Sequence, residues 1–303
     1  MAVLITGVSK GLGRALALEL ANRGHTIIGC SRDQIKLDSL QQQLSNTSPN
    51  RHFFFKLDVT SDTHVQEFAQ FVAKNNLVPR ILVNNAGLAH RSAKIWELEA
   101  EEFDNVIDTN VKGIANILRH FVPLMIQNNN GIIVNMSSGA GRSAHEDFAP
   151  YCSSKWAVEG LTKCVAKGLP DGMAIVALNP GSIHTDMLVL CCGDSAAQFQ
   201  SPHKWYIHDS YLIFFLIQYP FFLFVLTSFL NITKYLLNIT KFHTTRYLLS
   251  TSFKSHFNVN VQIKQDAWPK CNFQIQNQPK KFSKKRLRDT LTLKTILTCP
   301  ECD

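Results

Sequence analysis

The last third of this 303-residue chain contains no glycine. All 15 glycines lie before residue 206, and residues 206–303 also lack methionine and hold a single alanine, Ala267. Globular domains use these residue types throughout their length, so this composition excludes an ordinary folded domain there. The chain therefore divides into residues 1–205, which carry the signals of a folded domain, and an atypical C-terminal region, residues 206–303.

The first two thirds of the chain lack any excess of charge. Residues 206–303 carry 13 basic and 5 acidic side chains, so the whole net charge of +8 lies in the C-terminal region. The basic run from Lys280 to Arg288 is the one candidate for nucleic-acid or acidic-membrane binding. We expect it to be a solvated, disordered stretch, and we expect no nucleic-acid partner.

The eight cysteines show no pattern of paired spacings. Cys299 and Cys302 have the spacing of a zinc-binding pair, but no second pair or histidine partner follows them, so we expect no metal site. A secretory signal pattern is also lacking at the N-terminus. Reduced thiols in the cytoplasm are the simplest expectation.

One long apolar run does occur, at residues 211–230, and it is long enough to cross a hydrocarbon core of ~30 Å. A C-terminal membrane anchor is therefore one interpretation, although Gln218 and Pro220 in the middle of the run count against it. We favour a second interpretation, a translated intron or a mistaken gene model. The codons of Trp205 and Tyr206 necessarily contain the letters GTA of a splice donor, and the following residues are those of AT-rich codons.

Residues 1–205 alternate short apolar runs with amphipathic stretches, which is the order of a parallel sheet covered by helices on both faces. Strands are predicted at residues 2–6, 26–30, 53–57, 80–83, 131–135 and 173–178. Apolar residues at helical spacing predict helices at residues 14–22, 63–74 and 101–125. The fold class is α/β, a doubly wound, Rossmann-type sheet, whose ligands bind beyond the carboxyl ends of the strands.

The first predicted strand ends in a glycine-rich turn, Thr6-Gly7-Val8-Ser9-Lys10-Gly11-Leu12-Gly13. Glycines let the main chain approach a pyrophosphate, and the helix that follows directs its positive N-terminal end at the anion. The turn therefore predicts a dinucleotide-binding site. Its cofactor-binding residues are expected to be Gly7, Ser9, Lys10, Gly11, Leu12 and Gly13.

The end of the second strand is expected to select the nucleotide. A guanidinium at this position pairs with the 2′-phosphate of NADP, whereas a carboxylate accepts from the ribose hydroxyls of NAD. Arg32, together with Lys10, favours NADPH. The alternative is that Arg32 is a solvated surface charge and Asp33 binds the ribose.

The third and fourth strands also end in candidate cofactor contacts. Asp58, followed by Val59, can accept from the adenine amino group. After the fourth strand, Asn85, Ala86 and Gly87 leave room for a ribose against the main chain. Each of these residues is also suited to cap a helix or form a turn.

The residues that carry the chemistry are Tyr151 and Lys155, one helical turn apart. A neighbouring ammonium stabilises the phenolate left when a tyrosine donates its proton, which makes the pair a usable general acid. Ser138, after the fifth strand, is placed to hold an oxygen that gains negative charge. Asn110 is a candidate to hold a water that resupplies the proton.

In this order and spacing, the glycine turn, Asn84-Asn85-Ala86-Gly87, Asn110, Ser138, Tyr151-Cys152-Ser153-Ser154-Lys155 and Asn179-Pro180-Gly181 resemble the short-chain dehydrogenase/reductases. The resemblance implies reduction of an aldehyde or ketone by NADPH, with pterin and other aromatic aldehydes as substrates of plant members. It implies that Tyr151 is the acid, that Lys155 binds the nicotinamide ribose, and that Ser138 orients the carbonyl. It also implies that Asn110 anchors a relay water, and it adds nicotinamide contacts at Pro180, Gly181, Ile183 and Thr185.

The resemblance ends near Trp205. Family members continue with a helix, a further strand and a C-terminal segment that builds the dimer face, and we expect residues 206–303 to supply none of these. A homodimer or homotetramer is expected only if this region folds. The alternative function is an impaired reductase that only binds nucleotide or is anchored to a membrane. Closer to the site, the stretch His145-Glu146-Asp147 is expected to make the pocket wall acidic.

Overall fold

The computed structural model describes residues 1–128, 131–204 and 259–262. In chain order, the described elements are β1 (Ala2–Thr6), α1 (Gly11–Asn22), β2 (Thr26–Ser31), α2 (Gln34–Thr47), β3 (Phe53–Lys56), α3 (Asp62–Lys74), β4 (Ile81–Asn84), η1 (Ile95–Glu97), α4 (Ala100–Ile107), η2 (Asp108–Lys112), α5 (Gly113–Gln127), β5 (Gly131–Met136), η3 (Gly139–Gly141), α6 (Ala149–Gly168), β6 (Met173–Leu178), α7 (Asp186–Cys192), η4 (Gly193–Gln198) and β7 (Val259–Gln262). The six strands predicted from the sequence, which are β1 to β6, are confirmed to within one residue at either end.

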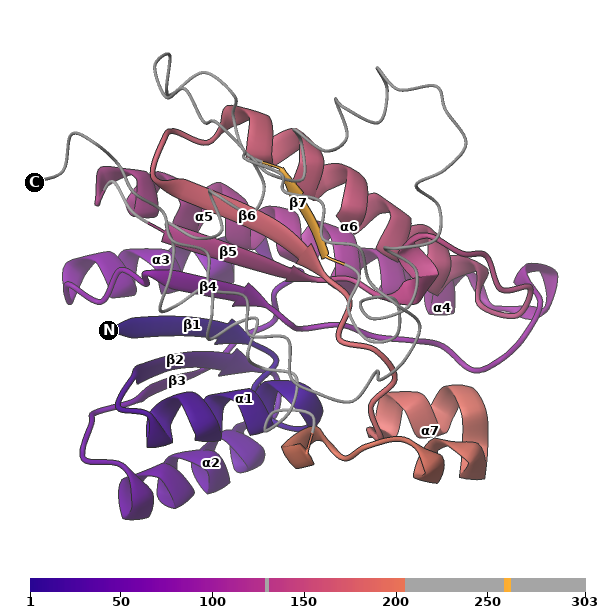
Figure 1. The fold of residues 1–303 in the computed structure, drawn as a ribbon, viewed down its shortest axis with the longest axis horizontal. Helices are drawn as coiled ribbons and strands as arrows, with labels where there is room; N and C mark the ends of the chain where they lie inside the picture. The colour runs from indigo at the N-terminus through magenta and orange to yellow at the C-terminus, as the bar shows by residue number, and fades with distance from the viewer. Residues whose placement is uncertain (129–130, 205–258, 263–303) are drawn as a thin grey trace, which may run out of the picture. The chain divides into compact units, whose positions relative to one another are not determined.

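The strands form one sheet in the order β3-β2-β1-β4-β5-β6-β7. Strands β1 to β6 are parallel, and their carboxyl ends point to the same edge of the sheet (Figure 1). Strand β1 lies between β2 and β4, so the direction in which the chain adds strands reverses there. Ligands of doubly wound sheets bind at this reversal, beyond the carboxyl ends of the strands.

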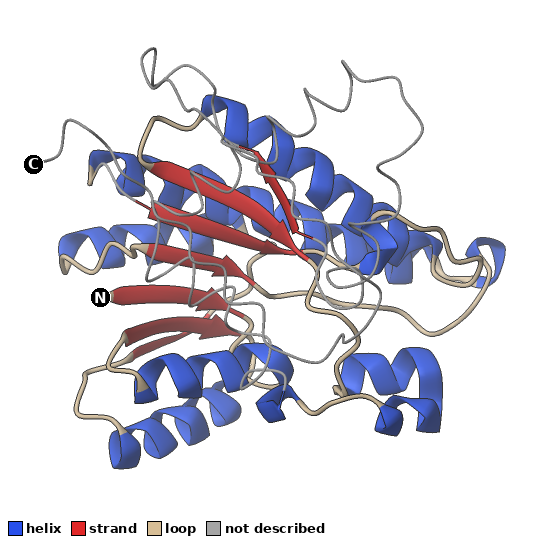
Figure 2. Cartoon of the chain, viewed as in Figure 1, coloured by secondary structure: helices blue, strands red, loops and turns tan. Residues whose placement is uncertain are grey.

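Helices cover both faces of the sheet (Figure 2). Alternate residues of β1 show why. Val3 and Ile5 pack with α1 and α2, whereas Leu4 packs on the opposite face with α3, α5 and α6. All three side chains are fully buried, as expected for a parallel strand covered on both sides.

The helix predicted at residues 101–125 is interrupted in its middle. It begins as α4, passes through the five-residue π-helix η2, and continues as α5. Gly113, the first residue of α5, lies so close to the loop after β3 that a Cβ atom there would lie 2.6 Å from Cγ2 of Val59. Single π turns inside α-helices often mark functional sites, and Asn110 is the central residue of this one.

The sheet also has a strand from the C-terminal region. The sequence predicted a sheet without its last strand, and the structure adds β7 beside β6, with Val259 opposite Leu178 and Gln262 opposite Ile175. β7 is antiparallel to β6, so it differs from the parallel strands that precede it. Its four residues give too short an alternating pattern to be recognised within a region of atypical composition.

The other predictions for the C-terminal region concern residues that the structure does not describe. They are the apolar run at residues 211–230, the basic run from Lys280 to Arg288 and the pair Cys299 and Cys302. Within residues 1–128, 131–204 and 259–262, no helix combines the length and apolar character needed to cross a membrane.

Candidate active site

A cleft of about 990 Å³ opens at the carboxyl ends of the parallel strands. Its walls come from the turn after β1, the ends of β2 to β6, the first turns of α6, and α7. All the residues predicted to bind cofactor line it, as do Ser138, Tyr151 and Lys155. Asn110 is the exception, because it is 1% exposed and lies behind the cleft wall.

The glycine turn forms a floor of bare main chain. Gly7 has a φ of +73°, and a Cβ atom on it would lie 2.9 Å from Cα of Ala86. A Cβ atom on Gly13 would collide with the main-chain oxygen of Gly7 and with Nδ2 of Asn85. The two glycines therefore let the turn pack closely on itself and on the loop after β4, and the N-terminus of α1 lies at the cleft.

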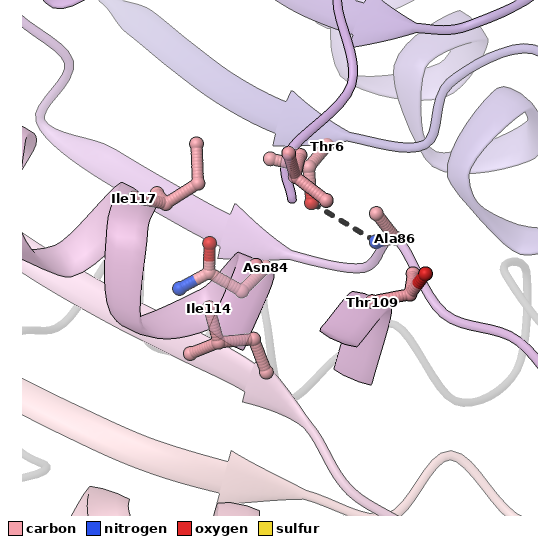
Figure 3. A pocket seen from close by; sticks show the side chains of 8 residues that line it. Thr6, Asn84, Ala86, Thr109, Ile114 and Ile117 are labelled. Atoms are coloured by element: carbon pink, nitrogen blue, oxygen red, sulfur yellow. Dashed lines mark hydrogen bonds between the residues drawn. The ribbon is translucent and has the colours of Figure 1, made fainter. Parts of the chain in front are cut away.

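Thr6 ties this floor to the loop after β4, a role that the sequence did not predict. Its Oγ1 accepts from the amide of Asn85 at 3.0 Å and from the amide of Ala86 at 2.9 Å, and Figure 3 shows the second of these bonds. The Asn85 side chain donates in return to the main-chain oxygens of Thr6, at 2.9 Å, and Gly7, at 3.2 Å. Asn85 thus supports the turn through its side chain. The role of Thr6 could have been inferred from the sequence, because a hydroxyl side chain at the end of a strand can bond to a neighbouring loop.

The packing beneath this floor is tight. Figure 3 shows Thr6, Asn84, Ala86, Thr109, Ile114 and Ile117 around a space that has no room for a water molecule. Because β1, β4 and α5 meet there without a gap, the glycine turn rests on a close-packed base.

Arg32 and Asp33 stand at the end of β2 in different states. Arg32 is exposed in the cleft, and none of the described residues makes a hydrogen bond or ion pair with it. Asp33 caps α2 by accepting from the amide of Lys36 at 3.1 Å, and its carboxylate lies 3.0 Å from Nζ of Lys36. These contacts hold the pKa of Asp33 below its usual value. The guanidinium is therefore available to a ligand, and the carboxylate is engaged.

Lys10, predicted to assist Arg32, is occupied in the structure. Its Nζ lies 2.7 Å from Oδ2 of Asp186, the first residue of α7. This contact lowers the pKa of Asp186 and links the glycine turn to α7 across the cleft. No sequence pattern identified Asp186.

Asp58, at the end of β3, has a structural contact of its own. Its Oδ1 accepts from the amide of Thr60 at 2.9 Å, so the side chain stabilises the turn that follows β3.

Tyr151 and Lys155 lie on one face of α6, with Nζ of Lys155 5.5 Å from the centre of the Tyr151 ring. Nζ donates to the main-chain oxygen of Met136 at 2.8 Å. Burial lowers the pKa of Lys155 to about 8. Burial also raises the pKa of Tyr151, and a hydrogen bond with Ser138 opposes that rise.

The sequence predicted that the ammonium of Lys155 stabilises the phenolate of Tyr151, and this stays a prediction. The largest influence on the pKa of Tyr151 is burial, which disfavours the phenolate and raises the pKa. The ammonium is bonded to Met136 instead of to the phenol oxygen.

Ser138 is placed by the turn that follows β5. It caps η3, and its Oγ accepts from the amide of Ala140 at 3.2 Å. The same hydroxyl lowers the pKa of the Tyr151 phenol, against the larger effect of burial. Both side chains line the cleft.

Both ends of the Asn110 side-chain amide have protein partners. Oδ1 accepts from the amide of Leu88 at 2.7 Å, and Nδ2 donates to the main-chain oxygen of Leu88 and to Oγ of Ser154, each at 2.9 Å. Ser154 in turn donates to the main-chain oxygen of Tyr151 at 2.7 Å. Asn110 thus connects the π turn, the loop after β4 and α6.

The loop after β6 carries Pro180, Gly181, Ile183 and Thr185 into the cleft wall. Gly181 has a φ of +76°, and its amide donates to Oδ1 of Asn179 at 3.0 Å. Oγ1 of Thr185 accepts from the amide of Leu188 and so caps α7. Its hydroxyl hydrogen remains available to a ligand.

The acidic stretch predicted in the pocket wall is turned away from it. Lys94 binds Glu146 at 2.7 Å and Asp147 at 3.0 Å, which raises the pKa of the lysine. Of the three residues, His145 alone lines the cleft. The expectation of an acidic wall was wrong because both carboxylates pair with Lys94, which is about fifty residues away in the sequence.

Comparisons with known proteins agree with this geometry. The family described as short chain dehydrogenase matches residues 1–190. The chain is 57% identical over 211 residues to an NADPH-dependent pterin aldehyde reductase of Arabidopsis thaliana, which covers 70% of this chain and 86% of that protein.

Two solved structures are also similar to this chain. A short chain dehydrogenase of Shigella flexneri complexed with NADP has a TM-score of 0.63 and 25% identity, covering 67% of this chain and 86% of that chain. An alcohol dehydrogenase of Thermococcus sibiricus complexed with 5-hydroxy-NADP has a TM-score of 0.64 and 25% identity, covering 70% of this chain and 89% of that chain.

Proposed function

Because the chain belongs to the short-chain dehydrogenase family, we propose that it reduces an aromatic aldehyde, such as a pterin aldehyde, with Tyr151 as general acid. At a coarser level, the protein is an NADP-dependent oxidoreductase that reduces a carbonyl group. The observation that carries the finer proposal is that Ser138, Tyr151 and Lys155 line one cleft, with Nζ of Lys155 5.5 Å from the centre of the Tyr151 ring.

The residues of the cleft fit NADPH. A Cβ atom on Gly7 or Gly13 would collide with protein atoms, so the two glycines allow the turn to close tightly before α1, which suits a pyrophosphate at the start of that helix. The engagement of Asp33 and the availability of Arg32 favour a 2′-phosphate over free ribose hydroxyls. When bound, the cofactor supplies the hydride. Asp58, Gly87, Ile183 and Thr185 are proposed to contact its adenine, ribose and carboxamide.

The protein supplies the proton and holds the oxygen that receives it. We assign to the Ser138 hydroxyl a hydrogen bond to the substrate oxygen, which gains negative charge during reduction. Tyr151 donates the proton. Its raised pKa keeps the phenol protonated throughout the neutral range, so the acid is always loaded.

Lys155 stabilises what remains after the donation. A phenolate left in a buried site needs a positive neighbour, and Nζ of Lys155 is the charge on that face of α6. Its bond to Met136 fixes the position of this charge. The contacts of Asn110 support a positioning role for its side chain, because they hold Leu88 and, through Ser154, the main chain of Tyr151.

The substrate side of the cleft favours a flat, partly apolar molecule. Phe148, Met187, Leu188 and Cys191 line it, and His145 adds a polar edge. Phe148 packs against the buried ring of His90 with a centroid distance of 5.6 Å, so its own ring is supported from behind. A supported aromatic wall suits an aromatic aldehyde.

The test is consumption of NADPH by the purified protein with a formylpterin, compared with an aliphatic aldehyde and with NADH as the donor. We expect the formylpterin and NADPH to give the highest kcat/KM. Equal rates with the aliphatic aldehyde would reject the aromatic preference. Tight NADPH binding without turnover of any carbonyl would instead favour the alternative, a chain that only binds nucleotide.

A further inference from the structure

The residues that leave β5 are bonded to one face of α6. The main-chain oxygen of Met136 accepts from Lys155, and Ser138, two residues further on, lines the cleft together with Tyr151. Tyr151 and Lys155 are four residues apart, so they share this face. The next residue on the face, four positions further along, is Glu159.

Glu159 binds the residue that lies between Met136 and Ser138 in the chain. Oγ of Ser137 donates to Oε1 of Glu159 at 2.8 Å. The Glu159 side chain is 5% exposed, and Nη2 of Arg142 lies 3.4 Å from the same oxygen. A carboxylate thus sits under the turn with a hydroxyl and a guanidinium directed at it.

The turn itself is pressed against α6. η3 lies between Ser138 and Arg142, and its last residue is Gly141. A Cβ atom on Gly141 would lie 2.9 Å from Oγ of Ser137 and 3.1 Å from Cγ of Glu159. The turn therefore approaches Glu159 as closely as a main chain can.

A buried carboxylate is stable only while its partners remain in place. Ser137 and Arg142 flank Ser138 on both sides along the chain, and both are bound to Glu159. Any shift of the turn that moves the Ser138 hydroxyl would also separate Glu159 from a partner. The contacts of Glu159 therefore resist a displacement of the Ser138 hydroxyl relative to Tyr151.

We propose that Glu159 is a positioning residue, which acts through Ser137 and Arg142 to hold the Ser138 hydroxyl against the Tyr151 phenol. This inference rests on the proposed reductase function. Glu159 does not itself line the cleft and reaches the lining through Ser137, so its effect on the reaction passes through the turn that carries Ser138.

The test is a double-mutant cycle between Glu159→Gln and Ser138→Ala. Glu159→Gln alone is expected to lower kcat about tenfold or more, since displacement of a reacting group by about 1 Å can cost 10²-fold. The Kd for NADPH is expected to stay within about twofold. In the Ser138→Ala background, Glu159→Gln should cause no further loss of kcat, because the hydroxyl that Glu159 positions is absent.

Thr162→Val is the matched control. Thr162 also joins β5 to α6, through a 2.9 Å hydrogen bond from Asn135, but it does not contact the turn. Any reduction of kcat caused by Thr162→Val should therefore be the same in wild type and in the Ser138→Ala background. If Glu159→Gln destabilises the protein, Ser137→Ala replaces it in the cycle, because it removes one bond to Glu159 and retains the charge.

Hydrogen exchange provides a measurement that does not depend on catalysis. In Glu159→Gln, the amides of residues 137–143 should exchange faster, with no change in α1 or α2. Additive losses in the cycle, or unchanged exchange in this segment, would overturn the inference. A wild-type protein that reduces no carbonyl would reject the proposed function, and the exchange result would still decide whether Glu159 holds the turn.

Discussion

Nζ of Lys155 donates to the main-chain oxygen of Met136 at 2.8 Å, so the ammonium is held at the end of β5. A neutral carbonyl is a weak substitute for the water that a lysine loses on burial. The pKa of Lys155 is accordingly lowered to about 8. This value lies close enough to neutrality to control the reaction and the stability of the protein.

The first prediction concerns the pH dependence of kcat/KM for NADPH. The charged form of Lys155 predominates below pH ~8, so kcat/KM for NADPH should fall as the pH rises through that value, since this ratio reports groups of the free enzyme. Lys155→Arg keeps its charge at all accessible pH values. A falling limb that persists unchanged in Lys155→Arg would assign the limb to another group.

The second prediction concerns stability. Because the pKa of Lys155 is lower in the folded protein than the ordinary value of 10.5, burial of the charge destabilises the fold fully below pH ~8. This penalty is relieved as the folded state loses its proton between about pH 8 and 10.5, by up to roughly 3 kcal/mol. In denaturant unfolding, Lys155→Met should therefore have a higher free energy of unfolding than wild type at pH 7, and the difference should shrink at pH 10. A difference independent of pH would contradict the lowered pKa of Lys155.

The third prediction concerns the acid. Tyr151→Phe removes one hydroxyl from a buried site and should lower kcat by about 10²–10⁴-fold, the usual contribution of a general acid. NADPH binding, measured by the quenching of protein fluorescence, should change little. Retention of more than a tenth of the activity would show that another group donates the proton.

The fourth prediction concerns the choice of nucleotide. Arg32→Ala should raise the Kd for NADPH about 10- to 100-fold, the loss of one charge-assisted pair, and leave the Kd for NADH unchanged. Arg51→Ala is the control, since Arg51 is also exposed but lies over the ring of Phe53 outside the cleft. If Arg32→Ala weakened the binding of NADPH and NADH equally, Arg32 would not bind the 2′-phosphate.

The fifth prediction compares two helical glycines. Gly160→Ala, in α6, meets nothing within 4 Å and should raise the free energy of unfolding by up to about 1 kcal/mol. Gly13→Ala, in α1, places a methyl group against Gly7 and Asn85 and should lower it by about 1–3 kcal/mol while weakening NADPH binding. Chemical denaturation and nucleotide titration of both variants provide the measurement. A stable Gly13→Ala with normal affinity would disprove the need for a bare floor.

The parallel sheet could be predicted because its strands are apolar on both faces and are separated by helical patterns. The ends of those strands also placed Arg32 and Ser138 in one cleft, since residues after parallel strands meet at one edge, and Tyr151 could be identified from its helical spacing to Lys155. Both predictions depend on patterns within short stretches of sequence.

Contacts between distant positions could not be predicted. Lys94 turning Glu146 outward, Asp186 engaging Lys10 and Glu159 reaching Ser137 all depend on three-dimensional proximity. The lowered pKa of Lys155 has the same origin, because burial is set by everything that packs around α6. The strand β7 escaped prediction for a different reason, since four residues carry too little pattern.

The ion pair between Lys10 and Asp186 has a kinetic consequence. The two side chains are 60% and 76% exposed, so dissolved ions screen their attraction. The bridge therefore opens easily, and it joins the glycine turn to α7 within the lining of the cleft in which the nucleotide is proposed to bind. If departure of that nucleotide limits turnover, as it does in many enzymes, the rate should rise with ionic strength.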